Sequence, residues 1–339
     1  MYTKIKELKT YGSVTIMNQE LFLIEVVDQG KRVIKMELNG IESILFEFID
    51  VENIYSLAFA EDYFMVSFKS GTTTFYSINS NQKVFQYNTI LPITFLHEDG
   101  YYMYMDDKDF LYRYNKCHHE IKIFPIGHKN MLLACVFNDN LICEFKGGKL
   151  FTYKNNPLNV LLSWQLDIRS LFPAEEDAEI SEIKDYQGSL IVVTSAAVLR
   201  LSVEDGSIIW ISEGYARTIE IVGNTGYVCT SGSLFKVNLD TGEESGYGWG
   251  EYHKLPNFTY NGKDYWATGH RVVYHDGLLW YSVYSSGDSF LIAINPENGN
   301  YEWIHYVDTI GKTDAPQFFG DYMFLYDTEH TLHIYQKES

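Results

Sequence analysis

The sequence is poor in basic residues. Its 339 residues include 26 lysines and arginines against 45 aspartates and glutamates, so the formal net charge is −19 at pH 7. The longest basic run is the pair Lys31-Arg32. A field of this sign repels the phosphates of nucleic acids and the headgroups of anionic lipids. The sequence therefore predicts that neither a nucleic acid nor a membrane is a partner.

Long apolar runs and paired cysteines are also missing. The longest apolar stretches, such as Met131 to Phe137, have about seven residues. A helix needs roughly 20 residues to cross a bilayer. The segment from Met1 to Thr10 alternates charged and apolar residues and contains no signal-peptide core. The 4 cysteines form no CxxC pair, which is typical of a reduced chain. These absences predict a cytoplasmic location.

No motif for catalysis is present either. We find no nucleophile elbow, no phosphate-binding glycine loop and no HExxH helix. The run Cys117-His118-His119-Glu120 offers four potential metal ligands. It falls on a predicted hairpin turn, where neighbouring side chains point to opposite faces and cannot all reach one ion. We therefore expect no catalytic residues, no metal site and no cofactor, and we do not expect an enzyme.

The sequence is rich in residues that favour strands. Aromatic residues make up 16% of the chain and tyrosine contributes 27, whereas proline contributes only 7. A hairpin with a short polar turn recurs, with the first turn residues at positions 39, 79, 115, 155, 204, 240, 297 and 336. Two further strands precede each hairpin, such as Ile54 to Phe59 with Tyr63 to Phe68. Four strands per repeat are typical of a propeller blade.

The repeat predicts an all-β fold, a single β-propeller over residues 1–339 built from four-stranded antiparallel blades. Eight turns indicate eight blades, or seven if one unit of the first half is irregular. The last unit has three strands ahead of the C-terminus, the last of them Thr331 to Tyr335, while an alternating segment, Tyr2 to Leu8, is left over at the other end. We expect this N-terminal strand to complete the last blade and so remove an exposed sheet edge.

Three hairpins of the second half share a polar turn with glycine. They run from Leu199 to Trp210, from Phe235 to Gly242 and from Ile292 to Trp303. This pattern resembles the PQQ-like repeat of the quinoprotein-like propellers. The resemblance implies the fold alone, because such propellers serve as dehydrogenases, assembly factors and binding scaffolds. Exported quinoprotein dehydrogenases carry a signal and many carry adjacent cysteines, which this chain lacks. Trp210 and Trp303 are expected to wedge against the following blade.

Two repeats are longer than the others, with insertions at residues 167–179 and 250–268. Both follow an outermost strand, so in a propeller they should project from the same face beside the channel mouth. Acidic and aromatic side chains are concentrated in them, and aromatic residues are common anchors of protein interfaces. The predicted partner-binding residues are Phe172, Glu175, Glu176, Asp177, Tyr252, His253, Tyr260, Tyr265 and Trp266. Two alternatives stay open: the aromatic residues could stack on a sugar, or the longer insertion could simply cover a blade edge.

These observations favour a non-enzymatic, cytoplasmic scaffold that binds another protein and is a monomer in isolation. The acidic surface favours a basic protein partner. One concrete version is an immunity protein that neutralises a toxin. The alternative is a carbohydrate-active or quinone-dependent enzyme that uses the channel mouth.

Overall fold

The structure is a computed structural model, and it describes residues 1–17, 19–28, 30–37, 42–48, 54–60, 63–88, 90, 93–97, 100–105, 110–115, 120–125, 131–137, 140–145, 148–156, 159–173, 178–248, 253–269 and 271–338. The chain divides into two compact units. The first unit comprises Met1–Ile44, Val192–Arg200 and Trp210–Ser339, and the second comprises Leu45–Ile191 and Leu201–Ile209.

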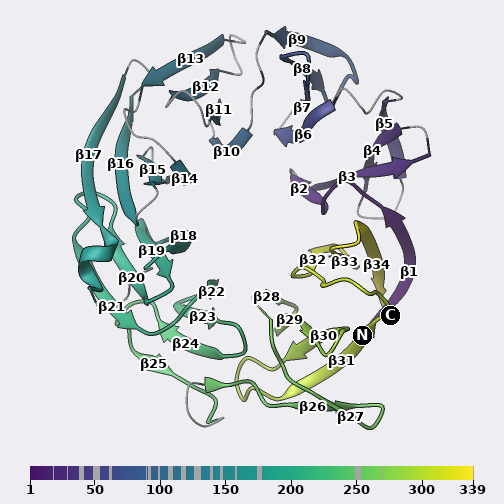
Figure 1. Cartoon of the computed structure of the whole chain (residues 1–339), viewed down its shortest axis with the longest axis vertical. Coiled ribbons are helices and arrows are strands. Elements are labelled where there is room, and N and C mark those ends of the chain that lie inside the picture. Colours follow the sequence, from purple (N-terminus) through teal and green to yellow (C-terminus); the bar gives the residue numbers. More distant parts are fainter. Residues whose placement is uncertain are drawn as a thin grey trace. The chain divides into compact units, whose positions relative to one another are not determined.

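Within the described residues, eight antiparallel sheets of four strands each account for most of the fold (Figure 1). In chain order, the first four sheets are β2 (Thr15–Met17), β3 (Glu20–Val27), β4 (Gly30–Met36) and β5 (Glu42–Phe48); β6 (Ile54–Ala60), β7 (Tyr63–Phe68), β8 (Thr72–Ser77) and β9 (Lys83–Tyr87); β10 (Ile93–His97), β11 (Gly100–Met105), β12 (Phe110–Asn115) and β13 (Glu120–Pro125); and β14 (Met131–Phe137), β15 (Asn140–Phe145), β16 (Lys149–Asn156) and β17 (Asn159–Asp167).

The other four sheets follow the same plan. They are β18 (Ile180–Tyr186), β19 (Ser189–Thr194), β20 (Ala197–Ser202) and β21 (Ile208–Glu213); β22 (Thr218–Val222), β23 (Thr225–Cys229), β24 (Leu234–Asn238) and β25 (Glu244–Ser245); β28 (Val272–His275), β29 (Leu278–Ser285), β30 (Asp288–Ile294) and β31 (Tyr301–Val307); and β32 (Gln317–Phe319), β33 (Tyr322–Tyr326) and β34 (Thr331–Lys337) with β1 (Tyr2–Lys9). The prediction of eight four-stranded units is confirmed.

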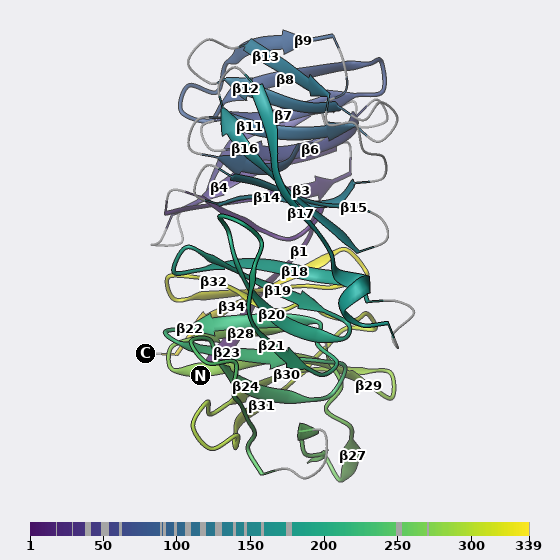
Figure 2. The same cartoon turned by 90° about the vertical axis from the view of Figure 1, so that its left-hand side faces the viewer.

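Two small elements lie between these sheets in the sequence. Strands β26 (Phe258–Tyr260) and β27 (Lys263–Tyr265) form a hairpin of their own in the longer of the two insertions. Among the described residues the only helix is η1 (Ile168–Leu171), a single 3-10 turn in the shorter insertion, drawn in teal in Figure 2. Both elements follow the outermost strand of one sheet and precede the first strand of the next.

The strand boundaries follow the apolar pattern, but three of the predicted turn positions lie within strands. Asn115 belongs to β12 and pairs with Glu120, and Gln336 belongs to β34 and pairs with Thr3. The third difference is at the fourth repeat. The sequence places a turn at Asn155 and Asn156, but β16 continues through both residues. Asn155 pairs with Val160 and Asn156 with Asn159. The backbone pairing of these two long strands therefore outweighs the turn preference of asparagine.

The N-terminal strand completes the last sheet. Strand β1 pairs antiparallel with β34, from Tyr2 opposite Lys337 to Lys9 opposite Thr331, and the two termini lie close together in Figure 1. The sheet order is β1-β34-β33-β32. The predicted pairing of the two chain ends is confirmed, and it supplies β34 with hydrogen bonds along an edge that would otherwise be open.

Trp210 joins its own sheet to the following one. Its indole N–H donates to the backbone carbonyl of Leu239 at 3.0 Å, across the turn that follows β24. The ring lies against Gly242, where a Cβ atom would be only 2.9 Å from Trp210 Cγ. Gly242 also has a φ of 78°, in the left-handed region that favours glycine. Glycine is therefore required at position 242 for two reasons: its backbone has a positive φ, and the Trp210 ring leaves no room for a Cβ atom.

The same arrangement occurs one repeat earlier. The indole N–H of Trp164 donates to the Val203 carbonyl at 2.9 Å, and its ring covers Gly206. Trp303 is half-buried and meets the ring of Trp280 edge-to-face at 5.6 Å. It packs against an apolar cluster to which the last sheet also contributes. The predicted structural role of Trp210 and Trp303 is confirmed, and Trp164 has the same role although the sequence analysis did not name it.

Replacing Gly242 with alanine should lower the free energy of unfolding by about 2–3 kcal/mol, because a left-handed backbone conformation and an overlap with Trp210 act together. Gly277 is a matched control, since it has the same φ of 78° but a Cβ atom added there would meet nothing within 4 Å. Gly277→Ala should cost only about 1 kcal/mol. Urea unfolding at pH 7 measures both, and equal losses would contradict a role for the tryptophan contact.

Candidate functional site

A cavity of about 1100 Å³ lies within the first unit. It is lined by the first strands of four sheets, namely β22, β28, β32 and β2, together with the loops that lead into them and the ends of two second strands. The lining residues are Ser13, Ile16, Thr218, Glu220, Ser231, Thr268, Gly269, Arg271, Val273, Tyr274, His275, Ser282, Tyr284, Lys312, Thr313, Asp314, Ala315, Pro316, Gln317 and Phe318. First strands and their preceding loops thus build one concave surface, which is where binding sites usually occur.

Charged groups of both signs face this cavity. The Glu220 carboxylate accepts the backbone N–H of Tyr274 at 3.1 Å and so bridges β22 and β28. Partial desolvation raises the pKa of the Asp314 carboxyl, and the positive charge of Arg271 offsets part of this effect. The Lys312 ammonium lies 5.4 Å from the centre of the Tyr284 ring, within the range of a cation–π contact. The acidic groups therefore come from a strand and a loop on different parts of the wall.

Aromatic rings form another part of the wall. The His275 ring stacks on Phe318 with centroids 3.9 Å apart and an angle of 9° between the planes. Burial lowers the pKa of His275 below its ordinary value, so the imidazole is neutral at pH 7. Tyr274 is also partly exposed on this wall, at 37% of its surface. The cavity therefore combines flat aromatic surfaces with carboxylates.

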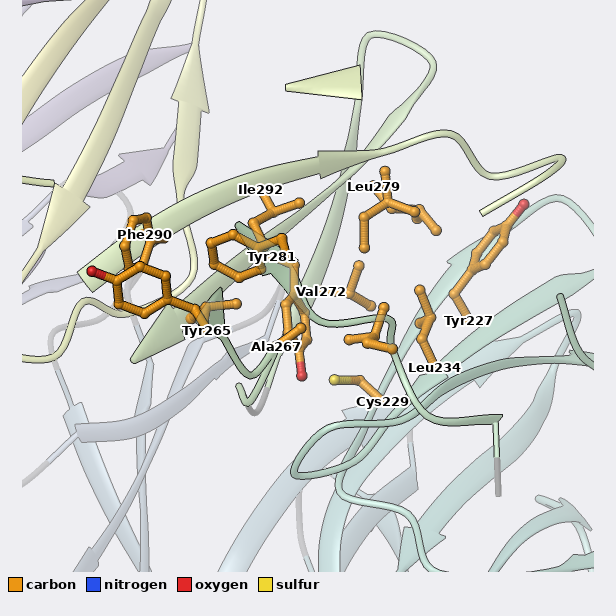
Figure 3. Close-up of a cluster of buried hydrophobic side chains, with 14 residues drawn as sticks. Tyr227, Cys229, Leu234, Tyr265, Ala267, Val272, Leu279, Tyr281, Phe290 and Ile292 are labelled. Carbon is orange, nitrogen blue, oxygen red and sulfur yellow. The ribbon is translucent and has the colours of Figure 1, made fainter. Parts of the chain in front are cut away.

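Most aromatic residues of the longer insertion pack inward. Phe258, Tyr260 and Tyr265 of the β26–β27 hairpin surround Phe290 of β30, at centroid distances of 5.1, 5.4 and 4.5 Å. Phe258 and Tyr265 belong to an apolar cluster of the first unit, and Tyr260 packs against it. Figure 3 shows Tyr265 beside Phe290 in this cluster. The Tyr265 hydroxyl donates to Asp288 at 2.8 Å. The β26–β27 hairpin covers the β28–β31 sheet on the side of β31, where Phe258 meets Tyr301 and Tyr260 meets Tyr306. Figure 1 also draws the hairpin beside β31.

Trp266 points the other way. It is 69% exposed, although the residue before it is buried. The backbone around it is fixed, because the Trp266 N–H donates to Ser285 Oγ at 3.2 Å and Thr268 exchanges hydrogen bonds with the backbone of Tyr284. Since Thr268 and Tyr284 both line the cavity, the exposed indole stands on a rigid segment beside the cavity wall.

A second exposed apolar side chain occupies a similar position. Ile310 is 81% exposed, and it and Trp266 are the two most exposed large apolar side chains among the described residues. The Thr309 hydroxyl donates to Asp327 at 2.5 Å, and the Ser289 hydroxyl donates to the Gly311 carbonyl at 2.6 Å. Lys312, two residues further on, lines the cavity. The sequence analysis missed Ile310, because it considered only the two long insertions. The signal that could have found it is a single isoleucine in a polar loop of ordinary length.

The other predicted site residues have different surroundings. His253 is half-buried beside the Phe235 ring at 5.5 Å, and Phe172 is buried after η1 in the second unit. Glu175, Glu176, Asp177 and Tyr252 lie outside the described residues, as do Cys117, His118 and His119. Partner binding through the predicted residues of the two insertions stays a prediction. The same holds for the joint projection of the insertions.

Among the residues that the structure describes, no group of three or more metal-ligating side chains is placed so that it could hold an ion. No helix in this part of the chain has the length and apolar character needed to span a membrane.

The sheets define the class of protein: the chain is an eight-bladed, all-β β-propeller whose last blade is completed by the N-terminal strand. No protein-family model matches the sequence, and no curated protein matches it. The fold-level resemblance to the PQQ-like and related propellers is confirmed by solved structures.

Three solved structures illustrate the likeness. The computationally designed protein Ika8 shares 9% identity, with a TM-score of 0.68 over 98% of this chain and 99% of its own. BamB from Moraxella catarrhalis shares 10%, with a TM-score of 0.64 over 99% and 100%. Sqt1 from Saccharomyces cerevisiae shares 8%, with a TM-score of 0.64 over 100% and 98%. At these identities the likeness defines the fold alone.

Proposed function

We propose that this chain is a propeller scaffold that binds another protein through the cavity side of its first unit, in the cytoplasm. The observation that carries the proposal is the placement of Trp266 and Ile310. They are the two most exposed large apolar side chains of the described residues, and each lies two residues from a residue of the cavity wall.

The rigidity of these two positions matters as much as their exposure. An apolar side chain on a mobile loop has to be ordered when a partner binds, and that ordering costs free energy. Trp266 and Ile310 stand on backbone that hydrogen bonds already fix. Tryptophan is also among the residues that contribute most to binding at protein interfaces. The pair therefore has the properties of preformed interface anchors.

The charge of the chain indicates what kind of partner fits. With a net charge of −19, the field steers basic proteins toward the surface and repels acidic ones. A toxin with a basic surface satisfies this requirement, so we propose an immunity protein as the specific form of the scaffold. The chain would then act as a monomer that occupies the toxin in a one-to-one complex.

Replacing both anchors, Trp266→Ala with Ile310→Ala, should weaken partner binding at least 100-fold, because truncation of an interface anchor costs about 2 kcal/mol or more. The partner is first captured from the source cells and identified by mass spectrometry. Affinity is then measured by interferometry with the purified proteins. Ile44→Ala is the matched control, since Ile44 is 56% exposed in the same unit. Unchanged affinity of the double variant would refute the proposed binding face.

A growth assay tests the immunity form separately. Cells that express the captured partner should stop growing, and co-expression of the wild-type chain, but not of the double variant, should restore growth. A harmless partner would refute the immunity role and leave protein binding intact. Titration calorimetry with sugars, Ca²⁺ and PQQ tests the alternative of a carbohydrate-active or quinone-dependent enzyme. A heat of binding with any of these ligands would favour that alternative.

A further inference from the structure

We infer that the cavity of the first unit binds a cationic side chain, a lysine or arginine, of a basic segment of the partner. The inference rests on the proposed function and specifies the chemistry that the cavity recognises. It is carried by the volume of the cavity, by the carboxylates Glu220 and Asp314 on its wall, and by the aromatic rings that line the same cavity.

The two carboxylates are suited to a cation for different reasons. Glu220 is held between β22 and β28 by the hydrogen bond from the Tyr274 N–H, so its charge is fixed in place before any ligand arrives. The Asp314 carboxyl is partly desolvated, which raises its pKa. A carboxylate in such surroundings has lost part of its hydration, and an incoming ammonium or guanidinium group would compensate for that loss.

The aromatic wall supplies a second type of interaction with a cation. Tyr274, Tyr284 and Phe318 all line the cavity, and the faces of such rings attract positive charge. One ring already holds a cation, because the Lys312 ammonium lies over Tyr284. This intramolecular contact shows that an aromatic ring of the wall can lie against an alkylammonium group.

The basic residues of the wall do not make it a site for anions. The charge of Arg271 acts on Asp314, where it offsets part of the rise in pKa that desolvation causes, and the Lys312 ammonium lies against the Tyr284 ring. Both cations thus already interact with groups of the wall. An anion entering the cavity would also meet the field of a chain whose net charge is −19, and that field attracts cations. The net negative charge of the chain therefore favours a cation at a wall whose own charges are mixed.

The cavity is also large enough for more than one residue. Its volume of about 1100 Å³ is just above the roughly 300–1,000 Å³ of small-molecule pockets. Trp266 and Ile310 flank the sheet β28–β31 from the loops before and after it. Since Thr268 and Lys312, two residues from these anchors, line the cavity, a partner segment that contacts the anchors lies beside the cavity and can direct a basic side chain into it.

A peptide probe tests the inference without the natural partner. The probe is a fluorescein-labelled heptapeptide that alternates glycine with arginine and lysine, and a matched peptide carries glutamate at the basic positions. Fluorescence anisotropy at 50 mM and 300 mM NaCl should show binding of the basic peptide only. The double variant Glu220→Gln with Asp314→Asn should weaken it at least tenfold, while the glutamine oxygen preserves the hydrogen bond from Tyr274.

The control variant removes the same two charges elsewhere in the unit. Glu213→Gln with Asp321→Asn changes two exposed carboxylates outside the cavity wall, and it should weaken the basic peptide less than twofold. Equal weakening by both double variants would attribute binding to the general field and overturn the inference. Tighter binding of the glutamate peptide, abolished by Arg271→Gln, would overturn it too, as would no binding of either peptide.

These outcomes are separate from those of the proposed function. The probe contains no apolar side chain, so its binding should be unchanged in the Trp266→Ala, Ile310→Ala variant. If the basic peptide does not bind while the Trp266→Ala, Ile310→Ala variant shows weakened binding of the partner, the inferred cation site is wrong and the proposed binding face is supported. If the basic peptide binds as expected while the variant binds the partner with unchanged affinity, the proposed binding face is wrong.

Discussion

Replacement of Asp327 by alanine should lower the free energy of unfolding by about 3–5 kcal/mol, the usual cost of breaking a buried charged network. The Asp327 side chain is only 2% exposed. Its carboxylate accepts hydrogen bonds from Thr309 Oγ1 at 2.5 Å, from the backbone N–H of Thr331 at 2.8 Å and from that of Glu329 at 3.0 Å, and it lies 2.9 Å from His333 Nε2. Alanine would remove the acceptor that all four groups share.

The network also connects the two ends of the chain. His333 lies on β34 and is 1% exposed, and its Nδ1 atom is 3.2 Å from Glu7 on β1. Loss of Asp327 therefore removes support from the strand pair that completes the last sheet. Urea unfolding at pH 7 measures the loss, and Asp321→Ala on the neighbouring exposed turn is the control, with an expected change within about 0.5 kcal/mol. Similar values for both variants would contradict a role for the network.

The contribution of Asp327 should depend on pH. Burial by itself would raise the pKa of this carboxyl, but hydrogen bonds from Thr309, His333 and Thr331 outweigh that effect and hold the pKa below its usual range. A lowered pKa in the folded state stabilises the protein above the unfolded value of about 3.9, and the stabilisation is lost as the pH falls toward the folded value. The difference between wild type and Asp327→Asn should thus be full at pH 7 and shrink below about pH 4.

Replacement of Phe290 by alanine should cost about 3–5 kcal/mol, because it opens a cavity where the ring is fully buried. Four aromatic rings meet Phe290 edge-to-face, three of them from the β26–β27 hairpin and one, Tyr306, from β31 at 5.6 Å. Each such pair adds about 0.5–1.5 kcal/mol beyond its buried area. The variant should therefore weaken the attachment of the hairpin as well as the core.

Limited proteolysis distinguishes these two effects. Lys254 and Lys263 are exposed on the insertion, and trypsin should cleave there many times faster in Phe290→Ala than in wild type under native conditions, because a detached hairpin is accessible. Tyr215→Ala is the control, since Tyr215 is 48% exposed, and it should change neither stability nor cleavage appreciably. A destabilised variant with unchanged cleavage would show that the hairpin is held by contacts other than Phe290.

The candidate site shows where sequence reasoning succeeds and where it fails. An aromatic segment between two repeats is visible in the sequence, because the repeat that contains it is longer than its neighbours. The sequence pattern does not tell which aromatic residues of this segment are buried and which are exposed. Tyr265 and Trp266 are adjacent and both aromatic, yet Tyr265 is 6% exposed and Trp266 is 69% exposed. Contacts with Phe290 and Asp288, both on β30 of another sheet, hold the Tyr265 side chain inward.

The cavity is beyond reach of the sequence for a related reason. Glu220, Tyr274 and Phe318 come from three different repeats, and their spacing in the chain carries no sign that they share a wall. The Asp327 network is likewise assembled from β1, β34 and two loops. Each of its residues, taken singly, is an ordinary polar residue of a strand or turn.

Local sequence patterns were sufficient to predict the all-β class, the four-stranded repeat and the pairing of the N-terminal strand with the last sheet. These features follow from period-2 alternation and turn chemistry, which act over a few residues. Three-dimensional packing was needed to establish which aromatic residues are buried, which two apolar side chains stand exposed, and which charges meet in one cavity. Those outcomes depend on contacts between residues distant in the chain, and local patterns do not encode them.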